Sequence, residues 1–233
     1  MFTAAALRQI GFQMNEQLEL ICSILRTSIY IVLFATWGIS VSNRIIQPQV
    51  RRYLVAISAL MGFWIAIRGI KYSLAECPWV MRHLWYLYYL GMLFIPLLVV
   101  FIALSLGKPE SFRLPKWTKL LYIPTTILLL LVLTNDLHQL VFRFPADATV
   151  WMDDYRYGIV YFLAVGWMVL CALTALAIML VKCRVPHSRN VLVLPFVPVI
   201  IALFYGVCYI FRAPWLRLIA ADMTVVFLSL IHI

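Results

Sequence analysis

Residues 83–106 read HLWYLYYLGMLFIPLLVVFIALSL, and this stretch decides the class of fold. It contains no Asp, Glu, Lys or Arg. At a rise of about 1.5 Å per residue, a helix of this length would extend for about 36 Å, whereas the hydrocarbon core of a bilayer is about 30 Å thick. The stretch therefore predicts a transmembrane helix.

Comparable apolar runs recur along the whole chain. We expect seven membrane-spanning helices, at residues 20–42, 53–70, 83–106, 120–137, 159–181, 191–211 and from 218 to the end. Of the 233 residues, 65% are apolar and only 12% are charged, and the mean hydropathy is +0.97. So few charges cannot cover a water-soluble fold of this size. The composition predicts an all-α polytopic membrane protein and excludes a soluble enzyme, a nucleic-acid-binding domain, a disordered chain and a secreted disulfide scaffold.

The distribution of basic residues predicts the topology. Cytoplasmic loops are enriched in Lys and Arg, and the first, third and fifth loops have the higher density of these residues. This places the amino terminus outside the cell. We therefore expect an extracellular tail at residues 1–19, followed by one transmembrane domain at residues 20–233. Residues 218–233 are fewer than the roughly 20 of a full span, so the seventh helix is expected to be truncated.

Four charged side chains fall inside the expected spans. They are Arg26, Arg68, Asp136 and Asp222. All lie in the outer third of the membrane in this topology, and an unpaired charge there is costly, so we expect the arginines and aspartates to neutralise one another. Nearby tyrosines would form the walls of an outward-open pocket for a small polar ligand: Tyr86, Tyr89, Tyr205 and Tyr209. Alternatively, the arginines extend to lipid headgroups and Asp136 caps a helix end, with no ligand.

The densest polar motif is TNDLHQLVF at residues 134–142, at the end of the fourth expected span. Asn135, Asp136 and His138 supply hydrogen-bond donors, acceptors and a group that changes charge near neutral pH. Asp136 and His138 would point to different faces of a continuing helix, and of the other histidines only His83 could reach them, so we expect no metal. Motifs for a nucleophile or a phosphate-binding loop are absent from the sequence, and we expect no cofactor or catalytic residue. A sensing role and a structural cap remain the two interpretations.

The NDLHQL segment at residues 135–140 resembles the amino-terminal seven-transmembrane sensor region of bacterial histidine kinases, especially the version found in gut Firmicutes. The resemblance extends to RRYL at 51–54, LWYLYY at 84–89, LPKW at 114–117 and RAPW at 212–215. It implies a multi-pass protein of the bacterial plasma membrane. It also implies that the seventh helix leads into a cytoplasmic histidine kinase or another output module.

The expected function is therefore that of a receptor. The chain would detect an extracellular or membrane-borne signal, either a small molecule or a peptide, and relay it to the covalently attached output module. Its other partner is the lipid bilayer, nucleic acid is not expected, and a homodimer remains open. The rival interpretation is a small transporter or an intramembrane hydrolase that uses Asp136 and His138. Transporters typically carry polar groups near the bilayer midplane and internal repeats, and we find neither in this sequence.

Overall fold

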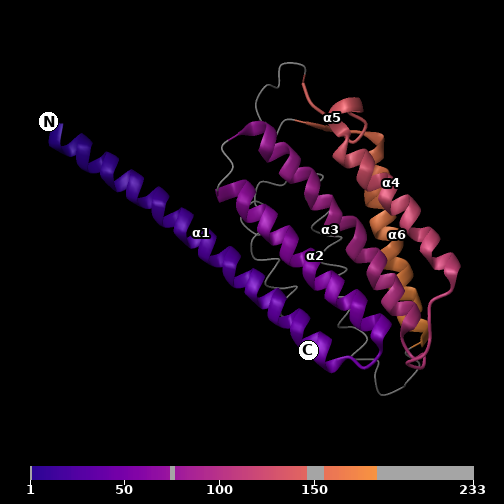
Figure 1. The fold of residues 1–233 in the computed structure, drawn as a ribbon. Helices are drawn as coiled ribbons and strands as arrows, with labels where there is room; N and C mark the ends of the chain where they lie inside the picture. The colour runs from indigo at the N-terminus through magenta and orange to yellow at the C-terminus, as the bar shows by residue number, and fades with distance from the viewer. Residues whose placement is uncertain (1, 74–76, 146–154, 183–233) are drawn as a thin grey trace. The chain divides into compact units, whose positions relative to one another are not determined.

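A computed structural model describes residues 2–73, 77–145 and 155–182 (Figure 1). The helices in these ranges are α1 (Phe2–Arg44), α2 (Pro48–Ser73), α3 (Pro78–Ser105), the 3-10 helix η1 (Lys116–Leu121), α4 (Tyr122–Leu133), the one-turn α5 (Asn135–His138) and α6 (Ile159–Lys182). Two short strands, β1 (Phe142–Arg143) and β2 (Arg156–Tyr157), lie between α5 and α6. The chain forms two compact units, residues 1–171 and 172–233, and the described part of the second is the last portion of α6.

Within these ranges, five segments are long and apolar enough to cross a membrane. They are Leu20–Arg44, Pro48–Lys71, Pro78–Ser105, Lys116–Leu133 and Ile159–Lys182. The first five predicted spans are thus confirmed as apolar helices of membrane-crossing length. The sixth and seventh predicted spans, at 191–211 and from 218 onward, lie outside the described residues.

The ends of several helices differ from the sequence-based expectation. α2 and α3 begin earlier than expected, at Pro48 and Pro78, because proline fits the first helical turn, where its missing N–H has no partner to lose. α1 begins at Phe2, so residues 2–19, expected to be a tail, continue the helix. The apolar part of α1 nevertheless begins at Leu20, as predicted.

The fourth predicted span, 120–137, is divided in the structure. η1 precedes α4, and α4 ends at Leu133. Pro124 therefore lies in the first turn of α4, where proline is tolerated. At the other end, the Thr134 hydroxyl donates to the carbonyl of Leu130 at 2.7 Å. This competes with the helical backbone pattern, and residues 135–138 form the separate turn α5.

α1 packs against α2 through small residues. A Cβ atom at Gly38 would lie 2.5 Å from Ser58 Oγ, and one at Gly69 would lie 2.6 Å from a methyl carbon of Thr27. The Ser58 hydroxyl donates to the carbonyl of Phe34, 2.6 Å away on α1. Close approach at small residues and polar contacts between helices are typical of helix packing in membranes.

The contacts continue from α2 to α3 and from α3 to α4, and a hydrogen bond joins α4 to α6. The Trp167 indole donates to Thr125 Oγ at 2.9 Å, and the Thr125 hydroxyl itself donates to the carbonyl of Leu121 at 3.0 Å. The fully buried Thr125 side chain therefore ties α6 to α4.

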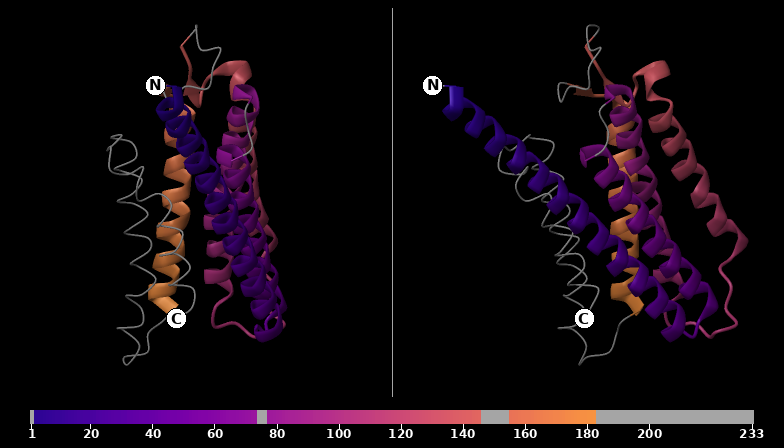
Figure 2. Two further views of the ribbon diagram at one scale, coloured as in Figure 1. Left: turned by 90° about the vertical axis from the view of Figure 1, so that its left-hand side faces the viewer. Right: turned by 60° about the vertical axis from the view of Figure 1, so that its left-hand side comes forward.

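α3 begins and α4 ends at the same end of the bundle, which we call the motif end (Figure 2). Among the described residues, a buried cluster rich in aromatic side chains lies there. Phe142 is fully buried there, with its ring centre 4.2 Å from that of Trp85 and 5.7 Å from that of Tyr161. β1 pairs antiparallel with β2, so that Phe142 lies opposite Tyr157. Next to the hairpin, Gly158 donates to the carbonyl of Val141 at 2.8 Å, and a Cβ atom at Gly158 would collide with the carbonyl of Leu140.

Candidate functional site

Asn135 is the most completely bonded polar side chain of the motif. Its Oδ1 accepts hydrogen bonds from the backbone N–H groups of Val141 at 2.9 Å and Phe142 at 3.0 Å. Its Nδ2 donates to the carbonyl of Phe142 at 3.0 Å and to Tyr86 Oη at 3.2 Å. An amide side chain offers two donors and two acceptor positions, so the bonding capacity of the buried Asn135 is filled. The chain reaches this side chain by a left-handed turn at Gln139, whose φ is 50°.

Asp136 lies at the centre of a second group, which we call the Asp136 cluster: Arg82, His83, Tyr86 and Asp136. The Tyr86 hydroxyl donates to Asp136 Oδ1 at 2.6 Å. Arg82 Nη1 lies 3.7 Å from the same oxygen, and His83 Nε2 lies 3.7 Å from Oδ2. The three α3 residues occupy one helical turn, so α3 presents all of them to the end of α4. The Asp136 side chain is 29% exposed, so solvent reaches the cluster.

Aromatic rings flank Arg82 and His83. The Arg82 guanidinium carbon lies 4.2 Å from the centre of the Phe144 ring, a cation–π distance. The His83 ring lies 4.1 Å from that of Trp79, and its Nδ1 is 2.9 Å from the Trp79 carbonyl. Because a carbonyl only accepts, this Nδ1 carries a hydrogen, and Nε2 is the atom that faces Asp136.

His138 faces its own turn. The backbone N–H of Leu140 donates to His138 Nδ1 at 3.0 Å, and Nε2 lies 3.3 Å from Thr134 Oγ. The Thr134 hydroxyl gives its hydrogen to Leu130, so it accepts from Nε2. This pattern assigns the neutral ring with its hydrogen on Nε2.

The comparisons with known proteins bear on this arrangement of apolar helices and a polar motif. Residues 20–232 match the family described as the N-terminal 7TM region of histidine kinase. The chain belongs to this family. No curated protein and no solved structure matches it. The protein is therefore a multi-pass membrane protein and the membrane sensor region of a histidine kinase, as the sequence motifs indicated.

The structure of this sensor region brings some of the predicted site residues together. Asn135, Asp136 and Tyr86 are joined by hydrogen bonds. Tyr89 is buried in the aromatic cluster, with its ring centre 5.9 Å from that of Phe142. Because Phe142 also stacks on Tyr86, its ring packs against two of the four predicted pocket tyrosines.

Other predicted residues are not part of these described contacts. Arg26 lies in α1 and Arg68 in α2, while Asp222, Tyr205 and Tyr209 lie outside the described residues. The ion pairs of Asp136 that the structure shows involve Arg82 and His83. His83 was expected within reach of the motif, and it is. No group of three or more His, Cys, Asp and Glu residues in the described ranges is arranged to hold a metal ion.

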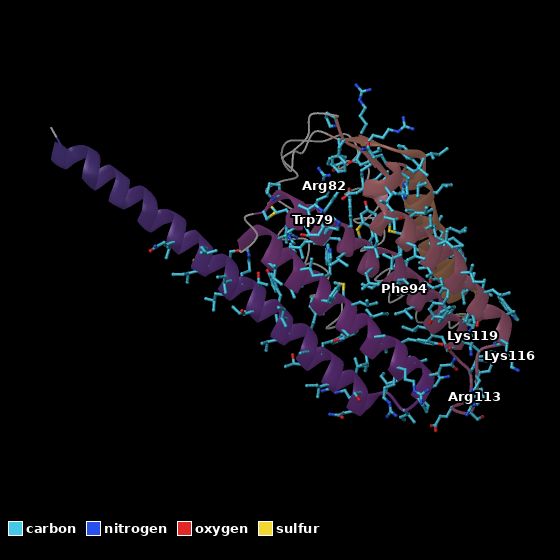
Figure 3. The ribbon with its side chains drawn as sticks, turned by 45° about the horizontal axis from the view of Figure 1, so that its top comes forward. Trp79, Arg82, Phe94, Arg113, Lys116 and Lys119 are labelled. Carbon is cyan, nitrogen blue, oxygen red and sulfur yellow. The ribbon has the colours of Figure 1, made fainter. Side chains whose placement is uncertain are left out.

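The sequence analysis missed Arg82 as a site residue. We expected the third helix to begin at residue 83, which left Arg82 in a loop. Pro78 was the missed signal, because a helix that begins there places Arg82 one turn before Tyr86. In Figure 3, Trp79 and Arg82 lie at the motif end. Three basic residues between α3 and α4 lie at the opposite end of the bundle: Arg113, Lys116 and Lys119.

Proposed function

We propose that this sensor region detects an extracellular or membrane-borne signal at the motif end and relays it to a cytoplasmic output module that follows the seventh span. In this proposal residues 1–19 precede the sensor domain on the outside, and the motif end faces outward. The higher density of Lys and Arg in the odd-numbered loops supports this orientation.

The Asp136 cluster is the observation that carries the proposal. It brings the charged side chains of Arg82 and Asp136 together at the end of a membrane bundle. Charged side chains are costly to place in a membrane, so those that occur there are candidates for a functional role. The carboxylate is partly exposed, and the nearest nitrogens of Arg82 and His83 lie 3.7 Å away, beyond hydrogen-bond distance. These groups therefore keep hydrogen-bonding capacity that a signal molecule can use.

The residues of the motif have different roles in this proposal. Asp136 contacts the signal, Asn135 holds the turn that presents it, and His138, which bonds the backbone of the same turn, takes part in recognition. Arg26, Arg68 and Asp222 complete the charged outer layer, and Asp222 neutralises one of the two arginines. A signal shifts the helices only through its different affinity for the two signalling states.

The test uses the full-length kinase in its membrane, with autophosphorylation as the readout under conditions that activate the wild type. Asp136→Asn and His138→Ala should each abolish the response while membrane insertion and abundance remain normal. Lys108→Ala, at an exposed position in the connection after α3, is the matched control and should respond normally. Normal responses from both motif variants would show that residues 134–142 are structural and that the signal binds elsewhere.

A further inference from the structure

Asp136 is separated from Arg82 and from His83 by the same gap. Hydrogen bonds between a charged nitrogen and a carboxylate are about 2.7–2.9 Å long, whereas the distances from Asp136 to Arg82 Nη1 and to His83 Nε2 are both 3.7 Å. A polar separation of this length is the one at which a third group commonly bridges two side chains. Both nitrogens lie near Asp136, but each is too far from it for a direct hydrogen bond.

Arg82 and Asp136 both have hydrogen-bonding positions that no described residue fills. Arg82 has five N–H donors, and within the described ranges it donates no hydrogen bond, although its Nε is buried. Asp136 Oδ1 accepts from Tyr86, but no described residue donates to Oδ2 at hydrogen-bond distance. The cluster therefore offers a set of donors on α3 and an acceptor on α5, side by side.

The charges limit what can bind there. A simple anion attracted by Arg82 would be repelled by Asp136, and a simple cation attracted by Asp136 would be repelled by Arg82. A molecule that carries both charges a few ångströms apart can satisfy both side chains at once. It would also leave neither charge unpaired at the edge of the membrane, where an unpaired charge is costly.

We propose that the Asp136 cluster binds a small zwitterion, with its acidic group on Arg82 and its primary ammonium on Asp136. This inference rests on the proposed function, because it takes the motif end as the site of recognition. The flanking rings of Trp79, which is 64% exposed, and Phe144 provide apolar contact for the remainder of the molecule. A free α-amino acid and a phosphatidylethanolamine headgroup both have this chemistry.

The experiment places the full-length kinase in nanodiscs of phosphatidylglycerol and measures its unfolding temperature with each of the proteinogenic amino acids. At least one should raise this temperature in a saturable way, and its N-acetyl and amide derivatives, which each lack one charge, should bind at least tenfold more weakly. In a second arm, phosphatidylethanolamine replaces part of the lipid in the absence of amino acids. Saturable stabilisation in this arm alone identifies the headgroup as the ligand and supports the same chemistry.

Variants provide the second line of the test. Arg82→Gln and Asp136→Asn should each weaken binding at least tenfold, whereas Arg113→Gln, at the opposite end of the bundle, should bind as the wild type does. No stabilisation in either arm, or equal binding of the capped derivatives, would overturn the inference. If Asp136→Asn abolishes signalling while no zwitterion binds, the proposed function stands and the ligand class is wrong.

Discussion

A single side chain, that of Asn135, joins three parts of the motif end. It belongs to α5, it bonds the backbone of β1, and it contacts Tyr86 on α3. The bonds to the backbone of Val141 and Phe142 reach residues six and seven positions further along the chain. This side chain therefore fixes the path of the backbone through the left-handed turn at Gln139.

We expect Asn135→Leu to lower the free energy of unfolding by at least about 3 kcal/mol, because it leaves several buried backbone groups unsatisfied, at about 1–3 kcal/mol each. Tryptophan fluorescence during unfolding in mixed micelles measures the change. Asp136→Asn is the matched control. Its amide oxygen can still accept from Tyr86, and a partly exposed ion pair contributes at most about 1 kcal/mol. Equal losses from the two variants would contradict the assigned roles.

At this scale the sequence identified the motif but not its bonding partners. Asn135, Asp136 and His138 attracted attention as polar residues at the end of an apolar run. Their separate hydrogen bonds depend on the turn at Gln139, and no glycine at that position signals a positive φ. The role of Asn135 in recognition remains a prediction, and its four hydrogen bonds give it a structural role as well.

Among the elements, α4 and α6 are linked by one polar contact between largely apolar surfaces. We expect Thr125→Val to destabilise the protein by about 1–2 kcal/mol, because the Trp167 indole N–H loses its acceptor. Trp167→Phe removes the donor, so the double variant should be less destabilised than the sum of the single variants. A double-mutant cycle on unfolding free energies measures this coupling, and strict additivity would show that the bond contributes nothing.

The α1–α2 contact gives a second prediction at the level of elements. Gly38→Ala should destabilise the protein by about 1–3 kcal/mol, because the new methyl group would displace the Ser58 hydroxyl from the Phe34 carbonyl. Gly62→Ala is the control on α2, since a Cβ atom there has no neighbour within 4 Å and alanine favours the helix. The comparison requires unfolding curves of both variants. A cost at Gly62 that equals the cost at Gly38 would refute the close packing.

Length and apolar character made five helices predictable, because each run is long enough to cross a bilayer. The helix ends were less predictable, because the charged Arg82 interrupts the apolar run near the start of α3, whereas the helix itself begins at Pro78. The hairpin was not foreseen at all. Its strands are two residues long, and a hydrophobic pattern of period two needs more residues than that to be recognised.

For the whole molecule, the proposed orientation has a direct test. Reporter fusions after Val50, Arg113 and Arg189 should be cytoplasmic, whereas fusions after Glu76 and Asp147 should be external. The physical reason is the retention of Lys-rich and Arg-rich loops on the cytoplasmic side. A reversed pattern would place the Asp136 cluster at the inner surface and exclude detection of an external signal there.

The close contact at Gly158 predicts which glycine positions of the chain tolerate random mutation. Any side chain at this position would collide with the backbone carbonyl of Leu140, which cannot rotate away as a side chain can. Gly166, within α6, has no atom within 4 Å of the Cβ atom that another residue would add there. A library of variants selected for normal abundance should therefore retain only glycine at 158 and accept many residues at 166. The most intolerant position would then be one that carries no functional group at all.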